Sequence, residues 1–365
     1  MKMHSIISPF VLSCALVLAN AALLQAQQHA VENWPPSAPK PSKKEKEKPV
    51  PHEYPKMGSI ERLDPALDAL IPPDAQIEKL AEGFEWSEGP VWDRRNDCLY
   101  FSDVPRNVVF KWVEGVGTRE FLLPSGYTGT APGGGQGSNG LVLDLGGRLV
   151  LCQHGDRRIA RLEKNGQFTT LIEYHKFRRL NSPNDLVYDA EGNLFFTDPP
   201  YGLAKLNDDP AKELMFNGVY RLARNGTLTL LTKELTFPNG IGLAPDNQTL
   251  YVAVSDAKRA IIMAYDVQTD GTIANGRVFF DATSLASAER KGVPDGLKVD
   301  KSGNVFATGP GGVLVLSPDG KHLGTILTGQ ATANCAFGGA DGSTLYMTAH
   351  MILCRVKTST KGKGF

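Results

Sequence analysis

The sequence predicts an all-β fold, a six-bladed β-propeller with four-stranded blades. Short apolar runs bounded by Gly, Asn, Asp and Pro dominate the chain after about residue 80, where helical periodicity is scarce. One pattern also recurs six times, at intervals of roughly 40–55 residues, as propeller blades do. A four-stranded blade cannot bury both of its faces alone, and stacking blades in a ring solves that problem.

The repeated pattern is clearest between Ser182 and Gly202, in the stretch SPNDLVYDAEGNLFFTDPPYG. A polar residue precedes an apolar strand over 186–188, turn residues follow at 190–193, and a second strand begins at Leu194. Every copy opens on a residue with a side-chain oxygen, and in a propeller these openings are expected to converge at one end of the central channel. In chain order they are Glu88, Asn139, Asn184, Asn239, Asp295 and Asn334.

The strands expected in each unit follow from the apolar runs. The second, third and fifth units, which open at Asn139, Asn184 and Asp295, contain four runs each. The third unit carries an insertion around 203–216, and the last strand of the fourth unit is expected near 277–280. The sixth unit shows only three runs. We expect a strand near 77–80, before the first unit, to complete the sixth unit and close the ring.

The N-terminal region is expected to lie outside the propeller domain, which we place at 58–365. Residues 1–26 have the pattern of a signal peptide, with Lys2 followed by an apolar run from Ile6 to Leu24. An uncleaved membrane anchor is the alternative, and lipidation of Cys14 is disfavoured because the apolar run continues past it. Residues 27–57 are rich in Pro, Lys and Glu and predict a disordered linker. The expectation is an exported protein, periplasmic or secreted, without stable membrane insertion after cleavage.

Composition limits the partners. The 365 residues include 39 Lys+Arg and 39 Asp+Glu, so no net charge is available to grip nucleic acid. The cysteines beyond the signal peptide show no CxxC spacing, which argues against a thiolate metal site. Buried free thiols are expected, and a Cys335–Cys354 bridge is the alternative in an exported protein. The four cysteines are Cys98, Cys152, Cys335 and Cys354.

The opening residues have the chemistry of a cation site. Asn-Gly and Asp-Gly pairs are strong turn signals, so each opening taken alone also fits a turn. Glu88, however, is a poor turn residue and takes the same place in its unit. Two carboxylates and several amide oxygens around one axis suit a hard cation, whereas zinc is not preferred because no Cys or His shares the position. Neither a GxSxG elbow nor a GxGxxG loop between a strand and a helix is present.

Several stretches resemble the gluconolactonase/regucalcin (senescence marker protein) family. They are SEGPVWD at 87–93, SPNDLVYDAEGNLFFTDPPYG at 182–202, FPNGIGLAPDNQTLYVAVSD at 237–256 and VPDGLKVDKSGNVFATG at 293–309. The stretch SNGLVLDLGGRLVLCQHGDRRIAR at 138–161 is similar to the bacterial gluconolactonase branch in particular. The resemblance spans residues 75–357, and four motifs in order at blade spacing make it specific.

The resemblance implies a six-bladed propeller with one divalent cation, commonly Ca²⁺, at the channel mouth. It makes Glu88, Asn239 and Asp295 the core cation ligands and Asp295 also the acid/base residue. Asn184 matches a residue that lies beside the cation and contacts substrate or completes the coordination. Regucalcin-like members carry an Arg two residues before that Asn, where this chain has Ser182, so the substrate is expected to differ from theirs.

The predicted function is a metal-dependent hydrolase that opens sugar lactones, similar to gluconolactone, by water attack at a cation-polarised carbonyl. Asp295 is expected to take the proton of the water and return it to the leaving alkoxide. A lactonase or phosphotriesterase of other specificity on the same metal site is one alternative, and a non-enzymatic ligand-binding propeller is another. The expected substrate contacts are Asn139, Asn184, His154 and Tyr201.

Overall fold

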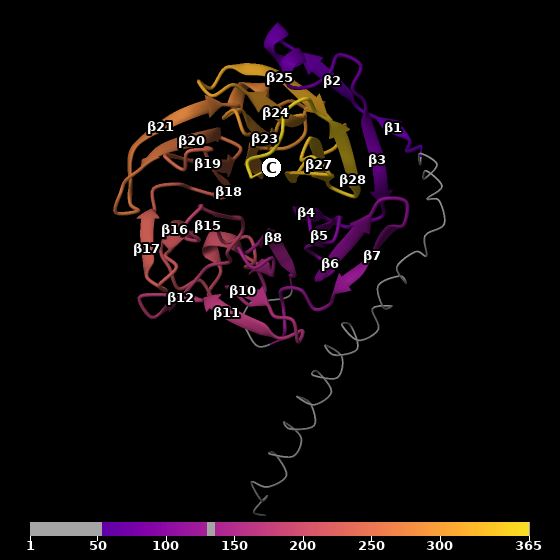
Figure 1. Cartoon of the computed structure of the whole chain (residues 1–365). Helices are drawn as coiled ribbons and strands as arrows, with labels where there is room; N and C mark the ends of the chain where they lie inside the picture. Colours follow the sequence, from indigo (N-terminus) through magenta and orange to yellow (C-terminus); the bar gives the residue numbers. More distant parts are fainter. Residues whose placement is uncertain (1–52, 130–135, 365) are drawn as a thin grey trace, which may run out of the picture.

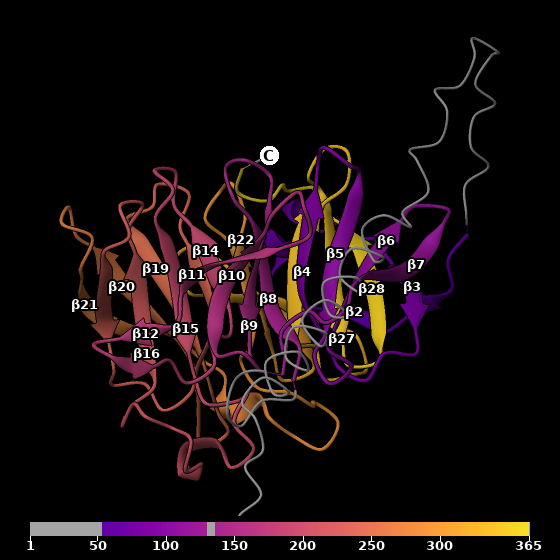
Figure 2. The ribbon, with the colours of Figure 1, turned by 90° about the horizontal axis from the view of Figure 1, so that it is seen from below.

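Six antiparallel β-sheets surround a central axis (Figure 1). The computed structural model describes residues 53–129 and 136–364. The predicted signal peptide at 1–26 and most of the predicted linker at 27–57 lie outside the described residues. Figure 2, turned by 90°, shows the strands running between the two faces of the ring. The predicted six-bladed, all-β propeller is therefore confirmed.

Blades 1 to 4 each consist of four consecutive strands, with the first strand of each innermost. Blade 1 contains β4 (Ser87–Asp93), β5 (Cys98–Asp103), β6 (Val108–Val113) and β7 (Gly117–Leu122). Blade 2 contains β8 (Ser138–Leu143), β9 (Leu149–Gln153), β10 (Arg158–Leu162) and β11 (Phe168–Ile172). Blade 3 contains β14 (Leu186–Tyr188), β15 (Leu194–Asp198), β16 (Gly218–Leu222) and β17 (Leu228–Thr232). Blade 4 contains β18 (Pro238–Leu243), β19 (Thr249–Asp256), β20 (Arg259–Val267) and β21 (Ile273–Asp281).

Blades 5 and 6 take extra strands from the beginning of the domain. Blade 5 contains β22 (Leu297–Val299), β23 (Val305–Gly309), β24 (Gly312–Leu316), β25 (His322–Leu327) and, at its outer edge, β2 (Ser59–Arg62). Blade 6 contains β26 (Asn334–Gly338), β27 (Thr344–Ala349), β28 (Ile352–Lys357), then β3 (Ile77–Glu82) and β1 (Lys56–Met57). The sequence pattern predicted neither β1 nor β2.

The ring closes where β3 pairs antiparallel with β28. Across this seam the Arg355 Nε donates to Glu78 Oε2 at 2.8 Å, although the two residues are 277 positions apart in the chain. The closing strand expected near 77–80 is thereby confirmed. Because the last blade is completed by an early strand, neither end of the sheet series is left as an unpaired edge at the seam.

Connections between consecutive strands within a blade are short apart from one insertion. The third blade carries it, as expected, between β15 and β16, and it contains the 3₁₀ helix η2 (Leu206–Asp208). Two further 3₁₀ helices are η1 (Pro65–Ala69) and η3 (Thr283–Leu285), and a small two-stranded sheet pairs β12 (Tyr174–His175) with β13 (Arg178–Arg179). In the ranges 53–129 and 136–364, no helix has the length and apolar character needed to span a membrane.

The core is divided into six apolar clusters, each shared by two neighbouring blades. Leu99 of β5 packs in one cluster with Tyr346 of β27, which joins blades 1 and 6. Each square ångström of apolar surface buried contributes about 25 cal/mol to the free energy of folding, and here that surface is buried where neighbouring blades pack together. The complete ring is therefore the stable unit. The four described cysteines are buried and free, as expected, and they lie in or beside these clusters.

Hydroxyl groups fasten neighbouring blades to each other near the axis. In blades 1, 3, 4 and 5 the penultimate residue of the second strand is Ser or Thr, and its hydroxyl donates to a backbone carbonyl at the opening of the next blade. The four bonds are Ser102 to Asn139 (2.8 Å), Thr197 to Asn239 (2.7 Å), Ser255 to Pro294 (2.5 Å) and Thr308 to Ala333 (3.1 Å). These bonds hold each opening against the blade before it.

Candidate active site

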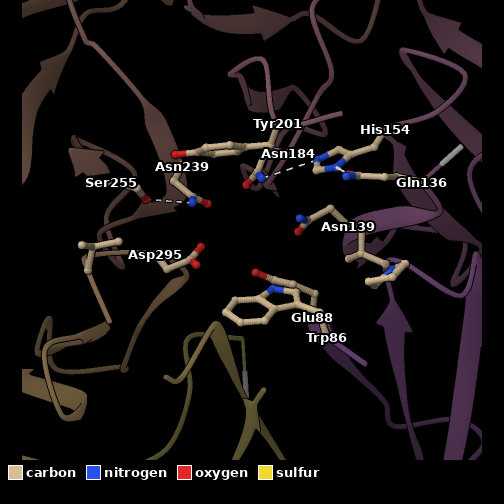
Figure 3. Close-up of a pocket in the computed structure, with 13 residues that line it drawn as sticks. Trp86, Glu88, Gln136, Asn139, His154, Asn184, Tyr201, Asn239, Ser255 and Asp295 are labelled. Atoms are coloured by element: carbon tan, nitrogen blue, oxygen red, sulfur yellow. Dashed lines mark hydrogen bonds between the residues drawn. The ribbon is translucent and has the colours of Figure 1, made fainter. Parts of the chain in front are cut away.

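Five of the six predicted opening residues line one cavity of about 360 Å³. In Figure 3 the carboxylates of Glu88 and Asp295 and the amides of Asn184 and Asn239 face the same space. The sixth opening residue, Asn334, is not among the lining residues. The remaining wall comes from loops and second strands. The lining residues are Trp86, Glu88, Val104, Pro105, Gln136, Asn139, His154, Asn184, Tyr201, Asn239, Ser255, Val293 and Asp295.

Irregular pairing at the start of the innermost strands places these side chains. In blades 1, 2 and 4 the pairing with the second strand shifts just after the opening, between Glu88 and Val91, between Ser138 and Leu141, and between Pro238 and Ile241. Such bulges redirect side chains and are frequent beside active sites. In blades 3 and 5 the innermost strand begins two residues after the site residue. The opening side chains are therefore freed from the regular alternation of the sheet.

The glycine after an opening residue allows the blades to approach closely. A Cβ on Gly240 would lie 2.0 Å from the Asp295 carbonyl oxygen, which accepts the Gly240 N–H at 3.0 Å. A Cβ on Gly89, which has a φ of +52°, would lie 2.1 Å from the Asn139 carbonyl oxygen. Only glycine fits such backbone contacts. The Asn-Gly and Asp-Gly pairs of the sequence thus act here as spacers between blades as well as turn residues.

The donor set of the cavity fits a hard cation. Asn139 Oδ1, Asn184 Oδ1 and Asp295 Oδ1 are buried and have no hydrogen-bond partner among the described residues. Leaving a buried acceptor unpaired costs about 1–3 kcal/mol, so three around one cavity call for a positive or proton-donating ligand. No three His, Cys, Asp or Glu side chains gather as a metal-binding group in the described part of the chain. Two carboxylates supplemented by amide oxygens are ligands that Ca²⁺ accepts.

The two carboxylates of the cavity repel each other. Burial first, and then the charge of Asp185, raises the pKa of Glu88 to about 7, although Gly89 N–H (2.5 Å) and Asn334 Nδ2 (3.1 Å) donate to its carboxylate. Burial and the charges of Glu88 and Asp185 raise the pKa of Asp295 well above its ordinary value. A bound cation would offset this repulsion and favour both ionised forms.

The cation-free protein is expected to lose stability as the pH rises, in part because of Glu88. Its pKa is 4.5 ordinarily and about 7 in the fold, so the folded chain keeps a proton that the unfolded chain has released. The stabilisation is complete below pH 4.5 and is lost as the pH rises through about 7. Thermal unfolding in EDTA should show a lower Tm for the wild type, relative to Glu88→Gln, as the pH rises. If Tm changes with pH in the same way in both proteins, the raised pKa of Glu88 is contradicted.

The whole propeller matches known proteins. The model for the SMP-30/Gluconolactonase/LRE-like region matches residues 86–351, which is more than half of the chain. This chain belongs to the SMP-30/gluconolactonase family. It is 38% identical over 318 residues to a gluconolactonase of Zymomonas mobilis, an alignment that covers 84% of this chain and 88% of that protein. It is 28% identical to pentonolactonase XacC of Haloferax volcanii, with 72% and 80% covered.

Solved structures of the SMP-30/gluconolactonase family share the fold. A gluconolactonase from Xanthomonas campestris is 31% identical and superimposes with a TM-score of 0.71 over 84% of this chain and 99% of that one. A calcium-binding regucalcin from Agrobacterium tumefaciens is 20% identical, with a TM-score of 0.62 over 79% and 94% of the two chains. The second likeness is one of fold alone. The family resemblance predicted from the motifs is confirmed.

His154 and Tyr201, both expected substrate contacts, line the cavity of this SMP-30/gluconolactonase member. His154 is buried, and burial lowers its pKa to about 3, so the imidazole is neutral at ordinary pH. The Tyr201 ring stacks on Phe237 with centroids 5.9 Å apart, and burial raises the pKa of its hydroxyl. Trp86, which no sequence pattern indicated, also lines the cavity, and its ring packs on that of His350 with centroids 5.2 Å apart.

A cluster of three polar side chains, Asn334, Asp185 and Lys298, lies beside Glu88 and holds it in place. Asn334 Nδ2 donates to Glu88 Oε2 at 3.1 Å and to Asp185 Oδ2 at 3.4 Å. Lys298 Nζ lies 3.9 Å from the same Asp185 oxygen and donates to Asn334 Oδ1 at 3.4 Å. Lys298 thus supplies the positive charge that partly balances the acidic side chains. Asp185 and Lys298 had not been singled out, because they follow opening residues at places where other units carry glycine or apolar residues.

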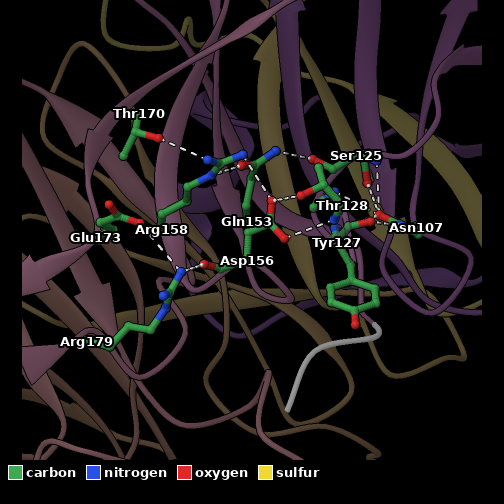
Figure 4. Close-up of polar contacts among 11 residues, drawn as sticks. Asn107, Ser125, Tyr127, Thr128, Gln153, Asp156, Arg158, Thr170, Glu173 and Arg179 are labelled. Carbon is green, nitrogen blue, oxygen red and sulfur yellow. Dashed lines mark hydrogen bonds and ion pairs between the residues drawn. The ribbon is translucent and has the colours of Figure 1, made fainter. Parts of the chain in front are cut away.

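Polar contacts from Asn107 and Asp156 hold residues 125–128, which precede blade 2 (Figure 4). Asn107 Oδ1 accepts the backbone N–H groups of three consecutive residues, 125–127, and Asp156 accepts both the N–H and the hydroxyl of Thr128 at 2.9 and 2.8 Å. Arg158 pairs with Asp156 at 3.0 Å. On the far side of the loop, Gly155 N–H donates to the Gln136 carbonyl at 3.1 Å, which holds Gln136 at the cavity wall.

Proposed function

We propose that this chain opens sugar lactones by hydrolysis at a divalent-cation site, with Ca²⁺ as the expected cation. Glu88, Asn239 and Asp295 would hold the cation, and Asn184 would complete the site. The observation that carries the proposal is the ring of buried, unpaired oxygens around one cavity that also contains two mutually repelling carboxylates. Membership of the SMP-30/gluconolactonase family supports the reaction class. The donor set, two carboxylates with amide oxygens, supports the choice of cation.

The chemistry divides between the cation and the protein. A bound divalent cation supplies Lewis-acid polarisation of the lactone carbonyl and stabilises the oxyanion that develops on it. Asp295 takes a proton from the attacking water and returns it to the ring oxygen that leaves as an alkoxide. Asn139 and Asn184, which line the cavity, would contact substrate oxygens, and Tyr201 and Trp86 line the same cavity.

The substrate class rests on the relatives. The relatives named gluconolactonase and pentonolactonase act on lactones of sugars, and the polar side chains of this cavity suit a polyhydroxylated ring. A lactonase of other specificity or a phosphotriesterase would use the same cation site, and the cavity wall would decide between them. A non-enzymatic binding propeller is disfavoured because it would not require two buried carboxylates at the cavity.

The proposed setting is outside the cytoplasm. The apolar run at 6–24 motivates export with loss of residues 1–26, followed by a linker that ends before strand β1 at Lys56. N-terminal sequencing of the protein from its native host checks this, and an intact Met1 in a cytoplasmic fraction would refute it.

Chelation is expected to abolish hydrolysis. Without the cation, the lactone carbonyl is not polarised and the two carboxylates repel each other. The test measures hydrolysis of a panel of aldonolactones, aliphatic lactones and a phosphotriester, in EDTA and after excess Ca²⁺ is restored. We expect sugar lactones to be hydrolysed best, with activity lost in EDTA and recovered with Ca²⁺. Undiminished hydrolysis in EDTA would contradict the cation's role, and preference for the phosphotriester would favour the alternative.

A further inference from the structure

An amide ligand has to be oriented, because its oxygen binds a cation and its NH₂ group repels one. Asn239 and Asn184 each present an amide to the cavity. A free amide has two orientations of similar shape, and only one is productive. The protein must therefore contain groups that recognise the nitrogen end of each amide and keep it away from the cavity.

Ser255 recognises the nitrogen end of Asn239. Asn239 Nδ2 donates to Ser255 Oγ at 2.9 Å, and Ser255 Oγ in turn donates to the Pro294 carbonyl oxygen at 2.5 Å. Since the Ser255 hydroxyl has committed its proton to Pro294, it can only accept from Asn239. Its acceptor side selects the NH₂ group, and the Asn239 oxygen is left for the cavity.

His154 recognises the nitrogen end of Asn184 by the same logic. Asn184 Nδ2 lies 3.5 Å from His154 Nε2, and His154 Nδ1 lies 3.3 Å from Gln136 Oε1. The Gln136 oxygen can only accept, so it selects the imidazole form with the proton on Nδ1, and Nε2 becomes an acceptor. That acceptor faces the Asn184 NH₂ group, which leaves Asn184 Oδ1 as the unpaired oxygen in the cavity.

We propose that Ser255 and the Gln136–His154 pair are positioning residues, which hold the amides of Asn239 and Asn184 with their oxygens toward the cation. The inference rests on the cation site of the proposed function. It assigns His154 an indirect role, since both of its ring nitrogens face protein groups rather than open cavity. It also gives Ser255 a second task beyond fastening blade 4 to blade 5.

The other hydroxyls that bond to the next blade allow the two roles of Ser255, joining blades 4 and 5 and orienting the Asn239 amide, to be distinguished. Ser102, Thr197 and Thr308 occupy the same place on the second strands of their blades and also donate to a carbonyl of the next blade. Among these four hydroxyls, only that of Ser255 accepts from the amide of a cavity-lining residue. Thr308 is therefore a matched control, because its hydroxyl fastens blades 5 and 6 and bonds only to backbone carbonyls, those of Gly296 and Ala333, without contacting the side chain of a proposed ligand.

The experiment measures Ca²⁺ affinity by isothermal titration calorimetry, a readout independent of turnover. Ser255→Ala is expected to weaken binding roughly 10–100-fold, the range typical of residues that orient metal ligands. Ser255→Thr should retain affinity, because Thr occupies this place in blades 3 and 5 and keeps the hydroxyl. Thr308→Val should lower the Tm by a similar amount to Ser255→Ala and leave Ca²⁺ affinity unchanged.

A double-mutant cycle then tests orientation itself. A carboxylate presents an oxygen whichever way it is turned, so in an Asn239→Asp background Ser255→Ala should change Ca²⁺ affinity by no more than about two-fold. Likewise His154→Phe should weaken Ca²⁺ binding in the wild type and not in Asn184→Asp. Equal losses in both backgrounds, or no loss in either, would overturn the inference while leaving the cation site intact. A wild-type chain that binds no Ca²⁺ would overturn the proposed site and the inference together.

Discussion

Asp295→Asn is expected to lower lactone turnover at saturating Ca²⁺ by roughly a hundred- to ten-thousand-fold, the usual contribution of a general acid/base. The substitution keeps an oxygen ligand and nearly the same volume, so Ca²⁺ affinity should weaken only modestly. What it removes is the one group in the proposed mechanism that takes the proton from water. The measurement is the rate of hydrolysis with Ca²⁺ well above its dissociation constant in both proteins.

Asn239→Asp is the matched comparison. It also exchanges an amide and a carboxylate at a proposed ligand, but it adds negative charge beside the cation and leaves Asp295 in place. Ca²⁺ affinity should hold or rise, and part of the activity should survive. If Asp295→Asn instead turns over at nearly the wild-type rate, Asp295 is only a ligand. Glu88, the other carboxylate that lines the cavity, would then be the next candidate for the base.

Gly240→Ala is expected to destabilise the ring and to impair the site together. The new methyl would stand 2.0 Å from the Asp295 carbonyl oxygen, so blades 4 and 5 must separate and lose the bond between Gly240 N–H and that oxygen. Overpacking and a lost buried hydrogen bond together cost roughly 2–6 kcal/mol, or about 3–10 °C in Tm for a domain of this size. A shift of about 1 Å between Asn239 and Asp295 would lower turnover by about a hundred-fold.

Gly146→Ala provides the control. This glycine is exposed, and the nearest atom to its added Cβ is a side-chain oxygen of Asp144 at 3.1 Å, so a shift of a few tenths of an ångström relieves the contact without breaking the hydrogen bond which that oxygen accepts from the Arg148 N–H. Differential scanning calorimetry and lactone hydrolysis should show near wild-type values for Gly146→Ala and large losses for Gly240→Ala. If both variants behave alike, close contact between blades at the openings does not determine the site geometry.

The ring could be predicted because the sequence motif of a blade repeats along the chain. Each blade repeats an opening residue, an apolar strand and a turn, and the chain before Glu88 supplied the strand that the sixth unit lacked. The outer strands β1 and β2 could not be foreseen in this way. They are short, and they form only because the exposed edges of β3 and β25 accept them. Such pairing depends on tertiary proximity and produces no periodic pattern in the sequence.

Prediction of the site was limited in a similar way, because a repeated motif shows which residues share a position but not which contacts they make. Glu88, Asn139, Asn184, Asn239 and Asp295 share one place in the repeat, and all five line the cavity. Asn334 has the same place but turns its amide to Glu88 and Asp185, because blade 6 meets blade 1 there. Ser255 and Gln136 carried no signal of their own. The repeat of Ser and Thr at the penultimate place of the second strands was available as a pattern, but only the contacts show that one member binds an amide.

The seam between β3 and β28 has a consequence for biogenesis. When β3 leaves the ribosome, its partner strand has not been made. At 5–20 residues per second the partner emerges roughly 14–55 s later, since the paired residues Glu78 and Arg355 are 277 positions apart. The nascent chain therefore carries an unmatched strand throughout its synthesis, and ring closure is a late event of high contact order. Chaperones have a long interval in which to bind that strand and keep the chain unfolded until the partner strand is made.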